Sequence, residues 1–227
     1  MPRAGEARFS FNETVFQGQP ASRYQMIFHT ANIFEAIYKM RDTINCYYGP
    51  DNKLLYGVKH TVESGYDVTD LLTFSYAGEK TSVHSFRYTP TATKLDTTLT
   101  ITSGYMFDML GTTLFLRTIN RHTVKSGDVF SCTVITGKDL IGTSFRYQGQ
   151  AIVERDNYRY RTHYYIVDIQ DDAFSQSKAS AELWMGDDDN YIPVKVRTKL
   201  KIGYAEVYLK SADNLKYPLD CRVQVKK

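Results

Sequence analysis

The strongest constraint on the fold of this chain lies between residues 194 and 202, where apolar and basic side chains alternate without a break. A two-residue period is typical of a β-strand with one buried and one solvent-exposed face, because successive side chains of a strand point to opposite sides. The apolar side consists of Val194, Val196, Thr198, Leu200 and Ile202, and the basic side of Lys195, Arg197, Lys199 and Lys201. The segment therefore predicts an amphipathic strand.

The composition favours a sheet-rich chain with a real core. Eighteen tyrosines and 12 phenylalanines stand beside a single tryptophan among 227 residues, and Tyr and Phe favour the half-buried surfaces of sheets. The net charge of +3 is too small to indicate a polyanionic partner. No apolar run approaches the ~18 residues of a membrane-spanning helix. Residues 1–8 contain no apolar signal-peptide region, so we expect this chain to carry no export signal.

Turn residues divide the chain into short segments with strand character. The predicted strands cover residues 8–13, 22–29, 43–48, 54–64, 71–76, 82–88, 97–101, 129–135, 142–154, 158–169, 180–185, 194–202 and 205–210. Two helices are predicted, over residues 31–41 after Thr30 and over residues 103–120 after Ser103, although Gly111 costs the second one ~1 kcal/mol. No linker interrupts the chain, so the prediction is one domain, residues 1–227. Its class is mainly β (α+β), with one large curved antiparallel sheet or half-open barrel and two short helices.

The last two strands predict a hairpin. Gly203 followed by Tyr204 suits a two-residue type II′ turn. This turn would pair Ile202 with Ala205, Leu200 with Val207, Thr198 with Leu209 and Lys201 with Glu206. A bulge at Gly203 within one continuous strand is the alternative.

Three segments resemble a known family. They are residues 105–117 (YMFDMLGTTLFLR), 145–153 (FRYQGQAIV) and 182–194 (ELWMGDDDNYIPV), the last continuing through residues 203–209. The family is domain-of-unknown-function family 3108, in the version of Bacteroides-type bacteria. Residues 4–10 resemble a point after that family's usual first strand or two, which implies that the opening strands are missing from this chain. The resemblance implies an exported protein, periplasmic or associated with the outer membrane, and says nothing about catalysis. A likeness to the half-open barrels of lipoprotein carriers, or to lipocalins, is expected at the level of the fold only.

The acidic run Asp187–Asp188–Asp189–Asn190 invites a calcium interpretation. An EF-hand loop needs oxygen ligands at alternate positions and a glycine at the sixth, where this chain has Tyr191 and Ile192 instead. The run therefore predicts a solvated turn, in which Asp and Asn bind their own backbone, and no metal site is predicted.

Basic and aromatic side chains also alternate between residues 158 and 164. Arg159, Arg161 and His163 could join the lysines of residues 195–201 on one sheet face, and such a face can bind single-stranded nucleic acid, anionic lipid or glycan. Nearby acidic residues balance the charge, so we expect the solvent-exposed side of a sheet and no nucleic-acid partner.

No catalytic motif is present among the sequence patterns that carry known chemistry. The five histidines are unpaired along the sequence, and the three cysteines, Cys46, Cys132 and Cys221, have no metal-ligand spacing, so at least one thiol is unpaired in a monomer. We expect neither an enzyme nor a cofactor.

These observations favour a non-catalytic envelope protein that holds an apolar, lipid-like or amphipathic ligand on a curved sheet. The ligand-lining residues would be Val194, Val196, Leu200, Ile202, Val207, Leu209 and Trp184. Two alternatives remain open. One is a structural module that pairs with envelope partners through a sheet edge. The other is a glycan hydrolase, for which Asp168, Asp171 and Asp172 are the candidate acids.

Overall fold

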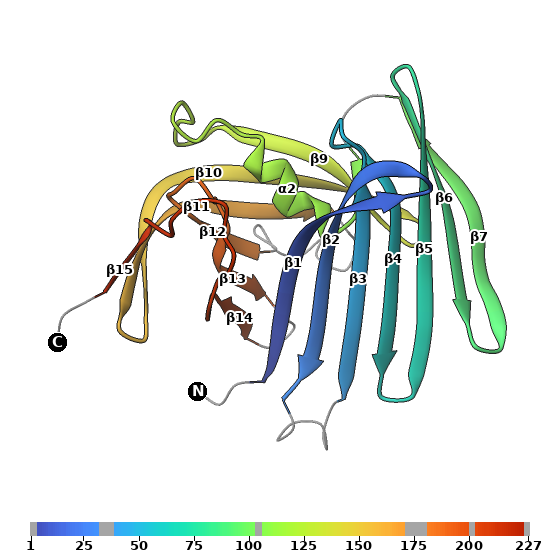
Figure 1. The fold of residues 1–227 in the computed structure, drawn as a ribbon, viewed down its shortest axis with the longest axis horizontal. Coiled ribbons are helices and arrows are strands. Elements are labelled where there is room, and N and C mark those ends of the chain that lie inside the picture. The colour runs from blue at the N-terminus through green and yellow to red at the C-terminus, as the bar shows by residue number, and fades with distance from the viewer. Residues whose placement is uncertain (1–3, 32–38, 103–105, 171–180, 200–202, 225–227) are drawn as a thin grey trace. The chain divides into compact units, whose positions relative to one another are not determined.

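The computed structural model describes residues 4–31, 39–102, 106–170, 181–199 and 203–224. The mainly β class is confirmed (Figure 1). The first seven strands are β1 Gly5–Phe16, β2 Gln19–Thr30, β3 Met40–Tyr48, β4 Leu54–Glu63, β5 Tyr66–Ala77, β6 Lys80–Thr89 and β7 Ala92–Ile101. They are followed by β8 Met106–Phe107, helix α2 Gly111–Arg117, β9 Val129–Thr136, β10 Asp139–Arg155, β11 Tyr158–Gln170, β12 Ala181–Gly186, β13 Pro193–Lys199, β14 Tyr204–Tyr208 and β15 Arg222–Gln224.

The strands form two sheets instead of the single continuous sheet that was predicted. The first sheet has the order β1-β2-β3-β4-β5-β6-β7, so each strand pairs with its sequence neighbour and every pairing is antiparallel. The second has the order β14-β13-β12-β11-β10-β9-β8, with β15 beside β11. It is mixed, because β8 and β9 are parallel. Turn glycines in the left-handed region, Gly18 after β1, Gly65 after β4 and Gly78 after β5, favour the tight connections of this meander.

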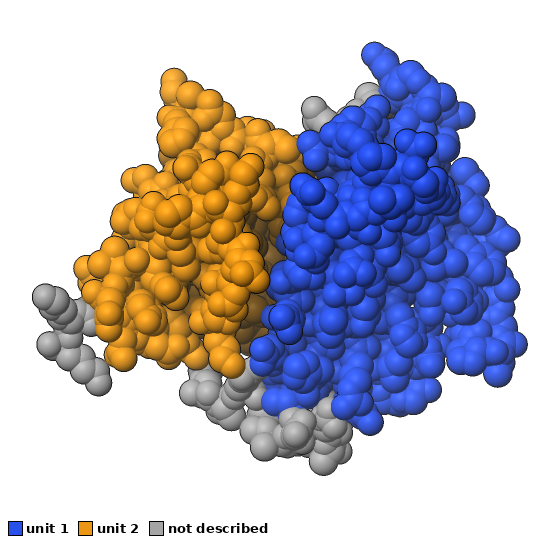
Figure 2. All heavy atoms as spheres, viewed as in Figure 1, with its two compact units in different colours: residues 1–112, 133–140 blue, residues 113–132, 141–227 orange. Residues whose placement is uncertain are grey.

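The structure divides into two compact units (Figure 2). The first comprises residues 1–112 and 133–140, and the second comprises residues 113–132 and 141–227. Strands β9 and β10 therefore contribute to both units. The prediction of one domain stays a prediction, and the two units are described separately below.

The helix predictions are only partly confirmed. Most of the first predicted helix, residues 32–38, lies outside the described residues. In the second segment the helix is α2 alone, because β8 occupies its predicted first turn. Gly111 begins α2, and Asp108 caps it by accepting a hydrogen bond from Gly111 N at 2.8 Å. A Cβ atom at Gly111 would lie 2.5 Å from the Tyr48 hydroxyl oxygen, so the glycine permits this close approach.

The predicted register of β13 and β14 is wrong by four positions. Thr198 lies opposite Ala205, and Val196 lies opposite Val207. The connection between the strands is longer than two residues and includes Gly203, whose φ of 76° is in the left-handed region. Lys201 of the predicted pair lies outside the described residues, and Glu206 forms an ion pair with Lys195 at 2.9 Å. The shift is even, so it keeps the same side chains on each face of the strand.

Candidate binding site

One cross-strand row of the first sheet changes from apolar to charged side chains. Taking one residue from each strand, β1 to β7, the register aligns Phe9, Met26, Ile44, Lys59, Asp70, Arg87 and Leu95. We call this set the central row. Cross-strand partners point to the same face of a sheet, and Ile44 in this row is buried. The row therefore lies on the face that carries the core of the first unit.

The apolar end of the central row is partly open to solvent. Phe9 is 49% exposed, and its neighbour Phe11 on the same face of β1 is 51% exposed. Both rings contact Tyr24, with ring centroids 6.4 and 6.2 Å apart. Strands lie about 4.8 Å apart, so the distance from Phe9 to Lys59 across three spacings is about 14 Å.

The charged end of the central row contains one tight ion pair. Arg87 donates hydrogen bonds from Nε to Asp70 Oδ1 at 2.5 Å and from Nη2 to Asp70 Oδ2 at 3.0 Å. Two parallel bonds of this kind fix both side chains. Ser85 holds the turn that adjoins them, because its hydroxyl donates to Gly137 O at 2.6 Å. Arg87 and Asp70 therefore form a tight ion pair with each other.

Lys59 and Asp42 are bound far less tightly. Lys59 Nζ lies 3.9 Å from Asp42 Oδ2, at the limit of an ion pair. Within the part of the chain that the structure describes, Lys59 Nζ donates no hydrogen bond. Asp42 Oδ1 is buried and has no hydrogen-bond partner among the residues that the structure describes, and the Asp42 side chain is only 6% exposed. Buried polar groups without a partner are uncommon in folded proteins, so the surroundings of Asp42 are a candidate functional site.

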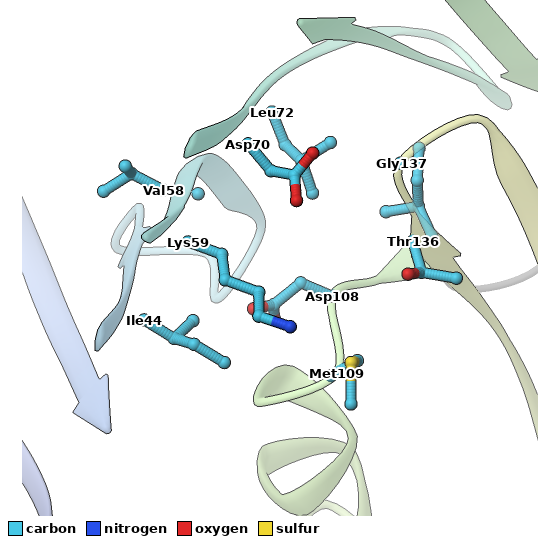
Figure 3. Close-up of a pocket in the computed structure, with 11 residues that line it drawn as sticks. Ile44, Val58, Lys59, Asp70, Leu72, Asp108, Met109, Thr136 and Gly137 are labelled. Carbon is cyan, nitrogen blue, oxygen red and sulfur yellow. The ribbon is translucent and has the colours of Figure 1, made fainter. Parts of the chain in front are cut away.

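A small pocket opens at the middle of the central row (Figure 3). On the sheet side its lining includes Ile44, Gly57, Lys59, Asp70 and Leu72. On the other side it is lined by Asp108, Met109 and residues 135–137, which also belong to the first unit. Its cavity volume is about 40 Å³. A water molecule needs about 10–15 Å³ on this measure, so the pocket accommodates a small polar group and not a whole lipid.

Gly57 creates part of this space. It lies opposite Cys46 and Leu72 in the row next to the central row. A Cβ atom at Gly57 would meet Leu72 at 3.7 Å, which is an ordinary contact. A larger side chain would therefore fill the pocket without disturbing the strand.

Asp108 anchors the segment opposite the sheet. Its carboxyl group accepts hydrogen bonds from Cys46 Sγ at 2.6 Å and from the Tyr48 hydroxyl at 3.5 Å, besides the one from Gly111 N. Burial raises the pKa of Asp108, and burial together with Asp108 raises the pKa of the Cys46 thiol. The thiol is therefore protonated and is a poor nucleophile.

The residues predicted to line a ligand site belong to the second unit, and their role in binding stays a prediction. Val194 is 2% exposed and packs with Val153, Tyr160 and Cys221 in a core cluster. Trp184 and Leu209 pack against this cluster, whereas Val207 is 52% exposed and Val196 is half-buried. Leu200 and Ile202 lie outside the described residues.

Several basic and aromatic side chains of the second unit contact one another or form ion pairs with acidic residues. Trp184 stacks on Tyr164, with centroids 4.8 Å apart, and Lys195 Nζ lies over the Trp184 ring at 4.8 Å. Arg197 Nε forms an ion pair with Glu182 at 2.8 Å. These contacts leave little charge or ring surface for an anionic or glycan ligand.

His163 departs from its predicted place on a solvent-exposed face. It is buried, with hydrogen bonds joining Nδ1 to the Tyr147 hydroxyl at 2.9 Å and Nε2 to Asp187 Oδ1 at 3.0 Å. The bulge between Tyr147 and Gly149 shifts the pairing of β10 and β11 at this point. Among the candidate hydrolase acids, Asp168 accepts a hydrogen bond from Arg146, and Asp171 and Asp172 lie outside the described residues.

The acidic run forms a turn, as predicted, but Asp188 and Asn190 are buried and not solvated. Asp188 Oδ1 accepts hydrogen bonds from the backbone of Asn190 and Tyr191, and its Oδ2 accepts one from Cys221 N. The Asn190 side chain binds the backbone of Tyr217 and Pro218. These polar groups are used to hold the C-terminal segment in place.

Sequence reasoning missed the central row. Only Asp70 carried a clear signal, because it alternates with the apolar residues Val68, Leu72 and Phe74 of its strand, whereas Lys59 alternates with polar residues of its own strand. A charged residue at an inward-facing position is costly without a partner and points to pairing or to function.

The first unit thus contains an antiparallel sheet with one face that carries both apolar and charged side chains around a small pocket. The family described as "Protein of unknown function (DUF3108)" matches residues 1–210. The chain belongs to this family, as its sequence motifs predicted. No curated protein matches the chain.

A solved structure has a similar fold. It is the crystal structure of a beta-barrel-like protein of the domain of unknown function DUF1849 from Brucella abortus. The TM-score is 0.60 at 11% sequence identity, and the match covers 91% of this chain and 86% of that one. At this identity the likeness concerns the fold alone. Among the described residues, no helix has the length and apolar character needed to cross a membrane.

Proposed function

We propose that this protein is a non-catalytic binding protein of the cell envelope, and that it holds a single-chain amphiphile along the central row. The observation that carries the proposal is the row itself, in which exposed aromatic side chains lead to a pocket with a loosely paired lysine. The apolar chain would lie over Phe9, Phe11 and Met26. The polar head would enter the pocket beside Lys59.

Energetics support this placement of the chain. Burying one phenylalanine side chain contributes about 1.5–3 kcal/mol relative to leaving it exposed. Phe9 and Phe11 are half exposed and lie side by side on one face of β1, and exposed apolar side chains that lie together are typical of binding surfaces. A ligand that covers Phe9 and Phe11 would gain this free energy.

The chemistry of the pocket supports a binding role over a catalytic one. Asp70 is held by Arg87, Asp108 is held by Cys46 and Gly111 N, and the Cys46 thiol is protonated. The location in the cell envelope is the part of the proposal that rests on the resemblance to exported proteins. Fractionation of cells that produce the protein, followed by detection with an antibody, tests it.

Isothermal titration with dodecyl amphiphiles below their micelle concentrations tests the binding. Gly57→Val places a branched side chain in the pocket and is expected to weaken binding at least about tenfold. Thr73→Val is the matched control, because it introduces the same side chain on the opposite, exposed face of the neighbouring strand β5. It is expected to bind like the wild type.

The proposal fails if the wild-type protein binds no amphiphile, or if Gly57→Val binds as tightly as Thr73→Val. Circular dichroism establishes that both variants are folded. If Gly57→Val does not fold, Gly57→Ala provides the same comparison with a smaller side chain.

A sheet-edge interaction module is the second candidate. It is favoured by β14, whose residues Tyr204 and Val207 are 57% and 52% exposed and which pairs only with β13 among the described strands. Strand addition to such an edge supplies backbone hydrogen bonds to a partner. Light scattering after size exclusion tests it, since a strict monomer at high concentration would argue against self-pairing.

A further inference from the structure

We infer that the pocket selects a neutral head group that carries hydroxyls, such as the glycerol or sugar of a single-chain lipid, over a carboxylate or an ammonium group. This inference rests on the proposed function and adds the chemical class of the head. The shared chemistry is a hydroxyl placed between Lys59 and Asp70.

The first argument is the charge balance around the pocket. Lys59 lies opposite Asp70 in the central row and forms its ion pair with Asp42. Arg87 forms the tight pair with Asp70. Around the pocket, the two carboxylates of Asp42 and Asp70 therefore balance the two cations of Lys59 and Arg87. An entering anion would be attracted by Lys59 and repelled by Asp42 and Asp70, so a full charge of either sign gains little.

The other titratable groups near the pocket do not disturb this balance. Asp108 lines the pocket, and burial raises its pKa, which favours the neutral carboxyl form. Asp139 acts on Arg87 from the turn after β9, but it is solvent-exposed, so its field is screened. A neutral ligand group is consistent with a site that is already neutral.

The second argument is the unused hydrogen-bonding capacity of the two side chains. A lysine ammonium has three N–H donors, and within the described residues Lys59 uses none of them in a hydrogen bond. Each oxygen of Asp70 accepts one hydrogen bond from Arg87 and keeps a further acceptor site. Lys59 and Asp70 both line the cavity, and their side chains reach toward it from neighbouring strands (Figure 3). A hydroxyl group is both acceptor and donor, so it can bind both residues at once.

Asp42 is a positioning residue in this arrangement. It is absent from the pocket lining but holds the negative charge that faces Lys59 from β3. Without this charge Lys59 would present a net positive charge to the pocket. The preference for a neutral head would then change to a preference for an anion.

The test compares four ligands with the same dodecyl chain: dodecanoate, dodecylammonium, a dodecyl glycerol ether and dodecyl glucoside. For the wild type, one of the two neutral ligands is expected to bind about tenfold more tightly than dodecanoate and dodecylammonium do. The glycerol and glucoside arms distinguish the two sources of hydroxyls. In Asp42→Asn, the affinity for dodecanoate relative to that for the neutral ligands is expected to rise about tenfold. In Lys59→Met, the affinity for dodecylammonium relative to that for the neutral ligands is expected to rise.

Asp96→Asn is the matched control, because it removes the same charge on the exposed face of the sheet, where Asp96 pairs with His84. It is expected to leave all four affinities in their wild-type ratios. The inference is overturned if a charged ligand binds best to the wild type, if all four bind equally, or if Asp96→Asn shifts selectivity as much as Asp42→Asn does. Each of these results leaves the proposed function intact, whereas the absence of binding by all four ligands refutes that function. Should buried Asp42 not tolerate replacement, the half-exposed Lys59 still provides a decisive variant.

Discussion

At the scale of single residues, Asp108 determines how one side of the pocket is held. It joins the start of α2 to β3 through Gly111 N, Cys46 and Tyr48. Because the group is fully enclosed, its carboxyl form is favoured over the carboxylate, and the pKa of Asp108 is raised by burial. This gives the first unit a measurable dependence on pH.

The pH dependence has a defined sign. Above the ordinary aspartate pKa of about 4, and up to its raised value in the folded protein, the folded state binds a proton that the unfolded chain has lost. Stability contributed by Asp108 is therefore complete below this window and is lost as the pH rises through it. Asp108→Asn stays neutral and keeps a good helix cap. We expect the urea midpoint of the wild type to fall, relative to that of Asp108→Asn, as the pH is raised from about 4 to 7. Parallel midpoints across this range would contradict the assignment.

The charged members of the pocket illustrate what the sequence can reveal at this scale. Asp70 could be identified as an inward-facing charge, because it alternates with Val68, Leu72 and Phe74 of its own strand. Lys59 could not, because the apolar residues Val58 and Val62 of its strand alternate in the opposite phase. The alignment of the charged side chains could not be predicted, because it depends on the register of every pairing from β3 to β6. Residues 135–137, at the end of β9 and the start of the turn after it, complete the pocket and come from a distant part of the sequence.

At the scale of elements, the turn after β12 fastens the C-terminal segment of the second unit. Asn190 Nδ2 donates to Tyr217 O at 3.0 Å and to Pro218 O at 2.9 Å, and Tyr217 N donates to Asn190 Oδ1 at 3.1 Å. The sequence predicted the turn from its Asp and Asn residues. It could not predict this partner, because side-chain bonds to a remote backbone leave no periodic pattern.

Loss of this fastening is expected to loosen the C-terminal segment. Asn190→Ala removes the three hydrogen bonds to the backbone of Tyr217 and Pro218, each of which contributes about 0.5–1.5 kcal/mol. We expect faster amide exchange over residues 211–221, measured by hydrogen–deuterium exchange. Asp189→Ala removes an exposed ion pair with Arg121 and is the control, since such pairs contribute about 0–1 kcal/mol. Equal exchange in the two variants would show that Asn190 does not hold the segment.

The strands themselves were largely predictable. Each predicted strand overlaps an observed one, because alternation records which side chains face the core. The short strands β8 and β15 were missed, since two or three residues are too few to show a period. The helix after Ser103 was extended too far because apolar residues at helical spacing also occur where a short strand precedes a short helix.

At the scale of the whole chain, the three thiols are free and all are buried. Burial raises the pKa of Cys132 to about 11 and raises the pKa of Cys46 and of Cys221 as well. Thiolates react far faster than thiols, so the folded chain combines low exposure with a low fraction of the reactive form.

This state predicts two results with Ellman's reagent. The native protein is expected to react slowly at pH 8, and denaturation in guanidinium is expected to release all three thiols to the reagent. The melting temperature is expected to be the same with and without dithiothreitol. Rapid labelling of the native protein, or a reductant-dependent melting temperature, would contradict the buried free thiols.

The meander of the first sheet has a consequence for the order of events during synthesis. Each of its strands pairs with the strand made just before it, so these contacts are local in sequence and form quickly. The pocket also needs residues 135–137, which are synthesised only after α2 and the first part of the second unit. Proteins emerge from the ribosome with the N-terminus first. A nascent chain that has released β7 can thus hydrogen-bond its sheet while the pocket is still incomplete, so folding precedes binding competence by the time needed to translate β9.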